Sequence, residues 1–183
     1  MTTDDKERQP DPEPSPELAL GTLLLGMPGV TIGTAESCTG GNIAARITSV
    51  AGSSSYYQGG IVSYANTIKA GILGVPASIL ANPGAVSAEC ADAMALGARN
   101  VLGVDWAVST TGIAGPGGGT ERKPIGLVYI ATAGPDTVRV SEHHFAGGRQ
   151  EVIQQATGEA LLRLLLALQS ISGIGIRAAN PAR

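Results

Sequence analysis

Short apolar segments rich in β-branched residues alternate with longer helical segments, and this alternation limits the possible folds more than any other feature of the chain. The expected strands are residues 30–34, 57–64, 106–110, 125–133 and 137–145. The expected helices are residues 15–26, 42–48, 66–73, 87–102 and 149–169, with a short helical turn at 76–80. Strands interleaved with helices predict an α/β domain in which helices cover both faces of one sheet.

A hairpin signal separates the last two expected strands. Gly134-Pro135-Asp136 combines the residue types that favour a tight turn. A hairpin joins antiparallel strands, whereas strands connected through a helix run parallel. The sequence therefore predicts a three-layer α/β/α sandwich with a mixed, mainly parallel central sheet.

The composition indicates one folded domain with a tail at each end. Glycine occupies 26 of 183 positions, and 43% of the residues are hydrophobic. So much apolar surface excludes a disordered chain, and the glycines are expected in loops where the backbone approaches a ligand or another loop. The predicted organisation is an acidic, Pro-rich disordered tail over 1–14, a domain over 15–170 and a flexible C-terminal tail over 171–183.

Negative charge is concentrated at the N-terminus. Residues 1–17 hold six acids and two bases, which leaves a net charge of +1 on the remainder. A nearly neutral body predicts no nucleic-acid partner. With no secretory signal and no apolar run of membrane-spanning length, the chain is expected to be cytoplasmic and to bind no membrane.

The cysteines and histidines do not indicate a disulfide framework or a metal site. Cys38 and Cys90 form no CxxC motif. His143 and His144 are adjacent, so on a strand they would point to opposite faces of the sheet. We therefore expect no metal.

The first candidate site is the turn Glu36-Ser37-Cys38-Thr39-Gly40-Gly41, between an expected strand and an expected helix. Open α/β sheets bind ligands at this position, and the turn offers nucleophiles and backbone N–H groups. Cys38 is a less favoured nucleophile than Ser37 because no histidine lies nearby in the sequence. A capped turn with no functional role is the alternative.

The second candidate is Lys69, one of two lysines outside the N-terminal tail. Its neighbours are apolar, so burial would lower its pKa and make the neutral amine available as a general base. The alternative is a surface lysine whose amine extends into solvent. Tyr64, five residues earlier, could reach the same cleft with its hydroxyl, or be a half-buried strand tyrosine.

Two further segments are typical of anion or ligand binding. The loop 110–120 contains five glycines, but it lacks the third glycine of a dinucleotide-binding fingerprint at the required spacing. Arg149 follows the last expected strand, where its planar guanidinium could bind a phosphate or carboxylate. The alternative for Arg149 is a residue at the start of a helix that binds loop carbonyls.

Four segments, in this order, resemble the C-terminal domain of the competence/damage-inducible CinA proteins, and the resemblance covers about residues 16–170. They are Ala35-Glu36-Ser37-Cys38-Thr39-Gly40-Gly41, Gly84-Ala85-Val86-Ser87, Thr111-Gly112-Ile113-Ala114-Gly115-Pro116 and Phe145-x-Gly147-x-Arg149. Full-length members of that family carry a nucleotide pyrophosphatase domain upstream. Here the predicted tail stands in its place, so we expect a stand-alone form without pyrophosphatase activity.

The resemblance implies a nicotinamide mononucleotide deamidase of pyridine nucleotide salvage, which hydrolyses the carboxamide to nicotinate mononucleotide and ammonia. The catalytic serine, tyrosine and lysine of the family fall on Ser37, Tyr64 and Lys69. No cofactor or metal is expected.

The expected mechanism is a serine acyl-enzyme. Ser37 attacks the carboxamide carbon, Lys69 takes its proton, and Tyr64 orients the lysine or relays the proton to the leaving ammonia. Backbone N–H groups of the turn would bind the oxyanion. The substrate-binding residues are expected to be Cys38, Thr39, Gly40, Gly41, Thr111, Gly112 and Arg149.

Two other functions are compatible with the sequence. One is a non-catalytic nucleotide- or partner-binding module linked to competence or DNA-damage responses. The other is phosphoryl-group chemistry with a metal, for which Glu36 and Asp105 lie near candidate loops without forming a carboxylate pair. A homodimer is expected because the apolar residues allow it and members of the family commonly associate.

Overall fold

The computed structural model describes residues 14–178. Nearly all of the predicted N-terminal tail and the last five residues of the chain lie outside the described residues. Within them, no helix combines the length and the apolar run that crossing a bilayer requires.

The centre of the fold is a five-stranded sheet with the order β2-β1-β3-β4-β5. Its strands are β1 (Ile32–Glu36), β2 (Tyr57–Val62), β3 (Trp106–Gly112), β4 (Leu127–Ala133) and β5 (Val138–His144). β1 pairs with β2 and β3 in parallel, and β4 is antiparallel to both β3 and β5. β5 consequently runs in the same direction as β1, β2 and β3, which confirms the mixed, mainly parallel sheet and the hairpin.

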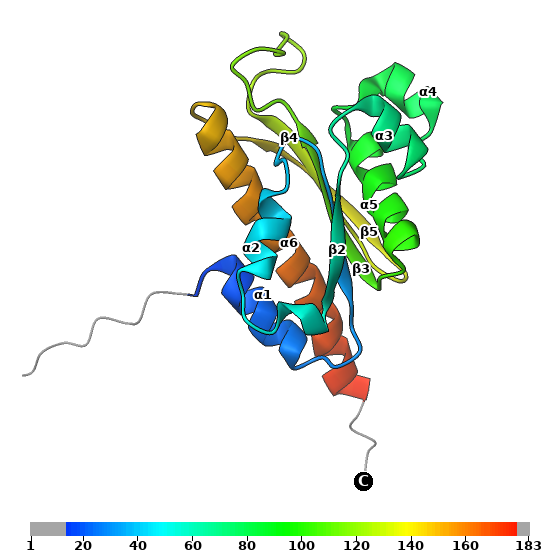
Figure 1. Ribbon diagram of the computed structural model, residues 1–183, viewed down its shortest axis with the longest axis vertical. Coiled ribbons are helices and arrows are strands. Elements are labelled where there is room, and N and C mark those ends of the chain that lie inside the picture. Colours follow the sequence, from blue (N-terminus) through cyan, green and yellow to red (C-terminus); the bar gives the residue numbers. More distant parts are fainter. Residues whose placement is uncertain (1–13, 179–183) are drawn as a thin grey trace, which may run out of the picture.

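Helices cover both faces of the sheet, as predicted for a three-layer sandwich (Figure 1). On one face, α6 (Arg149–Ala178) packs against β3 and β4, and it also packs against α1 (Pro16–Leu25) and α2 (Asn42–Thr48). On the other face, α5 (Ala88–Leu102) packs across the sheet, with α3 (Asn66–Gly71) and α4 (Ala77–Ile79) beside it (Figure 1).

One apolar core lies on each face of the sheet, and β3 contributes side chains to both. Trp106 and Val108 join the core beneath α6, whereas Ala107, between them, joins the core beneath α5. This division follows from the alternation of side chains along a strand. Small residues line the core between α5 and the sheet. Because of them, α5 lies close to the sheet and to the segment that follows α3.

Several element boundaries differ from the prediction, among them those of β1, β2 and α6. β1 begins two residues later than expected and continues to Glu36. β2 ends at Val62, so Ser63 and Tyr64 leave the sheet. The helix α6 continues to Ala178, beyond its predicted end at Gln169, because the glycines of this segment lower helix propensity without terminating the helix.

The close approach of α5 to the end of α3 depends on Gly97. A Cβ atom at this position would lie 2.0 Å from the carbonyl oxygen of Leu73, which is backbone and cannot rotate away. We expect Gly97→Ala to lower the free energy of unfolding by about 1–3 kcal/mol, measured by urea denaturation, because α5 or the segment after α3 must shift.

The matched control is Gly71→Ala in α3, where an added Cβ would meet no atom within 4 Å. Its effect should stay within about 1 kcal/mol. Equal losses of unfolding free energy in Gly97→Ala and Gly71→Ala would contradict a specific role for the close contact between Gly97 and Leu73.

Candidate active site

A buried serine–lysine pair lies where β1 and β2 end. Lys69 projects from α3, and its side-chain amine donates hydrogen bonds to Ser37 Oγ at 2.9 Å, to the Ser63 carbonyl at 2.7 Å and to the Tyr64 carbonyl at 3.2 Å. Only 1% of Lys69 is exposed. The structure therefore excludes the surface-lysine alternative and joins two of the predicted residues directly.

Burial also determines the protonation of Lys69. Desolvation of the amine lowers its pKa below the usual range of a lysine, and the weaker interactions with the thiols of Cys90 and Cys38 act in the opposite direction. No carboxylate within residues 14–178 forms an ion pair with this amine. Burial thus shifts the equilibrium of Lys69 towards its neutral form, which is the form that can accept a proton.

The carboxylate of Glu36 shapes the turn that carries Ser37. It accepts hydrogen bonds from the backbone N–H groups of Gly41, Ile43 and Ala44 at 2.9–3.1 Å, and from the hydroxyl of Thr39 at 2.7 Å. These bonds satisfy N–H groups that the first turn of α2 would otherwise leave without partners. Glu36 is therefore the cap of α2.

The two glycines of the turn allow this reversal of the chain. Gly40 and Gly41 have φ angles of 62° and 99°, which side-chain-bearing residues rarely adopt. The N–H of Gly40 donates to the Ser37 carbonyl and that of Gly41 to Glu36. Over the described chain, the N–H groups of Cys38 and Thr39 have no hydrogen-bond partner. Of the four N–H groups of residues 38–41, which are expected to bind an oxyanion, only these two have no partner, and Thr39 is fully buried.

A pocket of about 220 Å³ opens in front of Ser37. Seven of the ten predicted site residues line it, together with four residues that the sequence analysis did not select. The predicted ones are Ser37, Cys38, Tyr64, Lys69, Thr111, Gly112 and Arg149. Thr39, Gly40 and Gly41 do not line the pocket, because they form the far side of the turn and the Thr39 side chain is buried between Glu36 and Thr110.

Tyr64 and Arg149 meet at the mouth of the pocket. Arg149 donates to the carbonyl of Gly115 at 2.7 Å and to the hydroxyl of Tyr64 at 3.4 Å. Tyr64 is 63% exposed, and it contacts Lys69 through its backbone carbonyl rather than through its hydroxyl. The expectation that the hydroxyl orients the lysine is therefore wrong for this structure, because the side chain turns outward to Arg149.

The wall opposite Ser37 comes from the end of β3. Thr111 and Gly112 pair with β4, and the Thr111 hydroxyl donates to the carbonyl of Ala85 at 2.7 Å. The side chain of Thr111 thus connects β3 to the segment before α5. Beyond Gly112 the glycine-rich loop projects from the same end of the sheet (Figure 1).

Cys38 lines the pocket, but its thiol is poorly suited to nucleophilic attack. Burial raises the pKa of Cys38 to about 12. A thiol attacks as its thiolate, which is scarce at neutral pH when the pKa is this high. The structure therefore supports the preference for Ser37.

The remaining lining residues are Asn66, Ala85, Val86 and Ala114. Three of them belong to segments that carry the CinA resemblance, but their apolar side chains gave no chemical reason to select them. Asn66, the first residue of α3, could have been found from its position between Tyr64 and Lys69.

Glu36 and Asp105 cannot hold one metal together. Glu36 lies at the carboxyl end of β1, whereas Asp105 precedes β3 at the opposite end of the sheet and accepts hydrogen bonds from Thr31. Residues 14–178 contain no cluster of three or more histidine, cysteine or acidic side chains that could bind a metal ion.

Fold and site together define a three-layer α/β protein with a serine–lysine pair at the carboxyl end of its parallel strands. Residues 19–168 match the CinA C-terminal domain, and the chain belongs to this family.

Relatives and solved structures agree with this assignment. A CinA-like protein from Citrifermentans bemidjiense is 55% identical over 130 residues, which are 71% of this chain and 31% of that protein. Another from Parasynechococcus marenigrum is 48% identical over 143 residues, 77% of this chain and 34% of that protein. The chain thus spans about a third of the length of these curated relatives.

The structural neighbours are similar over nearly their whole length. The competence/damage inducible protein CihA from Agrobacterium tumefaciens has a TM-score of 0.79 and 40% identity, with coverage of 84% of this chain and 95% of that one. A CinA superfamily protein from Klebsiella pneumoniae has a TM-score of 0.79 and 31% identity, with coverage of 86% and 99%.

The role of Glu36 as a cap can be tested by Glu36→Gln. The amide keeps the shape of the carboxylate but has one acceptor oxygen, so its NH₂ group faces at least one backbone N–H. We expect the free energy of unfolding to fall by about 1–3 kcal/mol in urea denaturation. Glu89→Gln, at the exposed first turn of α5, should have little effect. Similar losses in the two variants would contradict the cap role.

Proposed function

We propose that this protein is a nicotinamide mononucleotide amidohydrolase that acts through an acyl-enzyme on Ser37. One observation carries the proposal: the amine of Lys69, buried and without an ion-pair partner in the described chain, lies 2.9 Å from Ser37 Oγ. Membership of the CinA family supports the substrate class, because the resemblance implies deamidation of this nucleotide.

The contacts of Lys69 can be kept when its amine loses a proton. The amine donates to three oxygen atoms, and the carbonyls of Ser63 and Tyr64 can only accept hydrogen bonds. A neutral amine retains two N–H groups for these carbonyls, and its lone pair can then accept the hydroxyl proton of Ser37. The neutral form of Lys69 would therefore act as a general base without losing either carbonyl contact.

In the first half of the reaction, Ser37 Oγ bonds to the carboxamide carbon and its proton passes to Lys69. The N–H group of Cys38, which has no other partner in the described chain and belongs to a residue that lines the pocket, stabilises the oxyanion that forms. Collapse of this intermediate breaks the C–N bond. Lys69 returns its proton to the leaving nitrogen, which departs as ammonia.

In the second half, water attacks the ester on Ser37 and gives its proton to Lys69. The second tetrahedral intermediate releases nicotinate mononucleotide, and Ser37 regains a proton from Lys69. The hydroxyl of Tyr64 contacts Arg149 in this structure, and its predicted relay of the proton to the leaving ammonia stays a prediction.

Arg149 is the candidate for binding the 5′-phosphate. It lies at the pocket mouth, and its guanidinium is held by the Gly115 carbonyl and the Tyr64 hydroxyl. A guanidinium in a fixed orientation binds phosphate by paired hydrogen bonds. Tyr64 then acts in substrate binding, as a positioning residue for Arg149.

The homodimer stays a prediction from the sequence.

The test is ammonia release from nicotinamide mononucleotide, its riboside and free nicotinamide. We expect hydrolysis of the mononucleotide to be preferred, and Ser37→Ala to reduce it by about 10³-fold or more because the nucleophile is lost. Arg149→Gln should raise KM for the mononucleotide while leaving the riboside little affected.

Cys38→Ala is the matched control for the nucleophile, since both side chains line the same pocket. Activity that survives Ser37→Ala and disappears in Cys38→Ala would transfer the role to the thiol. Tight binding of the mononucleotide without turnover, equal in wild type and Ser37→Ala, would instead indicate the non-catalytic binding module.

The pKa of Lys69 predicts the pH dependence. Because the base is the deprotonated amine, kcat/KM should rise with pH, with a midpoint below the usual pKa of a lysine. The free energy of unfolding should also rise with pH between the folded and unfolded pKa values of Lys69, since the unfolded chain binds more protons there. A rate that falls as the pH increases through neutrality would contradict Lys69 as the base.

A further inference from the structure

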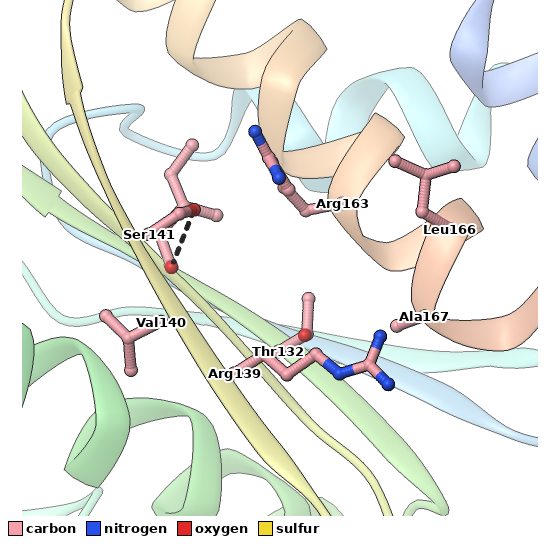
Figure 2. A pocket seen from close by; sticks show the side chains of 8 residues that line it. Thr132, Arg139, Val140, Ser141, Arg163, Leu166 and Ala167 are labelled. Atoms are coloured by element: carbon pink, nitrogen blue, oxygen red, sulfur yellow. Dashed lines mark hydrogen bonds between the residues drawn. The ribbon is translucent and has the colours of Figure 1, made fainter. Parts of the chain in front are cut away.

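A second pocket, of about 320 Å³, lies between α6 and the edge of the sheet (Figure 2). It shares no residue with the pocket at Ser37. Its polar lining residues are Thr132, Arg139, Ser141 and Arg163 (Figure 2). Arg163 lies 14 residues after Arg149 on α6, which corresponds to about 21 Å along the helix axis.

The pocket exists because small side chains face each other where α6 passes the sheet. Thr132 of β4 and Ala167 of α6 occupy positions where larger residues would close the gap. The apolar part of the lining is Ile130, Val140, Leu166 and Ala167. The pocket therefore offers an apolar surface beside its polar groups, as is typical of small-molecule sites.

Two arginines give the pocket an excess of positive charge. The side chain of Arg139 makes no hydrogen bond or ion pair with any residue in the range 14–178. Arg163 binds Glu159 through Nε at 2.6 Å, and its terminal nitrogens have no partner in the same range. Burial lowers the pKa of the neighbouring His143, so this side chain is neutral at pH 7. No carboxylate lines the pocket to neutralise Arg139.

A threonine hydroxyl completes the polar set. The residue Thr132 is 3% exposed, its side chain lines the pocket, and its hydroxyl makes no hydrogen bond within the described chain. The oxygen is not itself fully enclosed, so it can bond to a ligand atom in the pocket. The Ser141 hydroxyl donates only a long bond of 3.4 Å to the Ile130 carbonyl and also contacts His143.

We propose that this pocket binds a small organic anion, with a carboxylate or phosphate group at Arg139 and the Thr132 hydroxyl, an apolar body against Leu166 and Ile130, and Arg163 at the rim. The site is separate from the catalytic pocket and does not depend on the amidohydrolase proposal. Guanidinium groups and hydroxyls are the donors that both kinds of anion prefer.

The experiment is calorimetric titration of the full chain with phenyl phosphate, benzoate and inorganic phosphate. Benzyl alcohol is the neutral probe, because an aromatic amide would resemble the substrate proposed for the catalytic pocket. We expect an aromatic anion to bind, benzyl alcohol not to bind, and inorganic phosphate to bind more weakly because it lacks the apolar body. Preference between phenyl phosphate and benzoate identifies the anionic group. Arg139→Gln should weaken binding by about tenfold to a hundredfold.

Two further variants keep the result interpretable. Thr132→Val retains the shape of the side chain and removes only the hydroxyl, so weaker binding in this variant supports the proposal. Arg149→Gln removes the candidate phosphate-binding group of the catalytic pocket, so binding that persists in this variant and is weakened by Arg139→Gln belongs to the pocket at Arg139. Binding that is lost in Arg149→Gln and retained in Arg139→Gln would place the anion at the catalytic pocket and overturn the proposal, as would the absence of binding by every probe.

Discussion

The burial of the Lys69 amine is the constraint on which the site depends. An amine that is 1% exposed and has no carboxylate partner can be tolerated only where oxygen atoms surround it, and Ser37 Oγ and the carbonyls of Ser63 and Tyr64 supply them. These two carbonyls are free to accept from the amine because β2 ends at Val62, one residue before Ser63. The end of that strand, the start of α3 and the serine turn are thereby held in one arrangement.

Glu36 applies the same principle with the opposite charge. Its buried carboxylate is surrounded by donors from the turn and the first residues of α2, just as the buried amine is surrounded by acceptors. The two groups lie on either side of Ser37, but no ion pair joins them. Glu36 holds the backbone that presents the serine and the available N–H group of Cys38, while Lys69 holds the serine hydroxyl. The roles of structural support and proton transfer are therefore separated.

Most of the architecture could be predicted from local patterns. The hairpin at Gly134-Pro135-Asp136 and the helix capped by Ser87 depend on residues close together in the sequence, and both form as expected. The end of α6 could not be predicted, because glycines that weaken a helix do not necessarily end it. The pocket at Arg139 could not be predicted either, since it arises from the distance between a helix and a sheet edge.

At the site, the residue types alone identified Ser37, Lys69 and Arg149 as chemically capable groups, and the order of the motifs indicated the CinA family. Whether the lysine is exposed or buried, which N–H groups of the turn are already occupied, and which way the Tyr64 side chain points were decided only by the tertiary structure. The physical reason is that pKa, hydrogen-bond availability and side-chain direction depend on neighbours that are distant in the sequence. Composition and spacing specify what a residue can do, and packing determines which of these roles its surroundings permit.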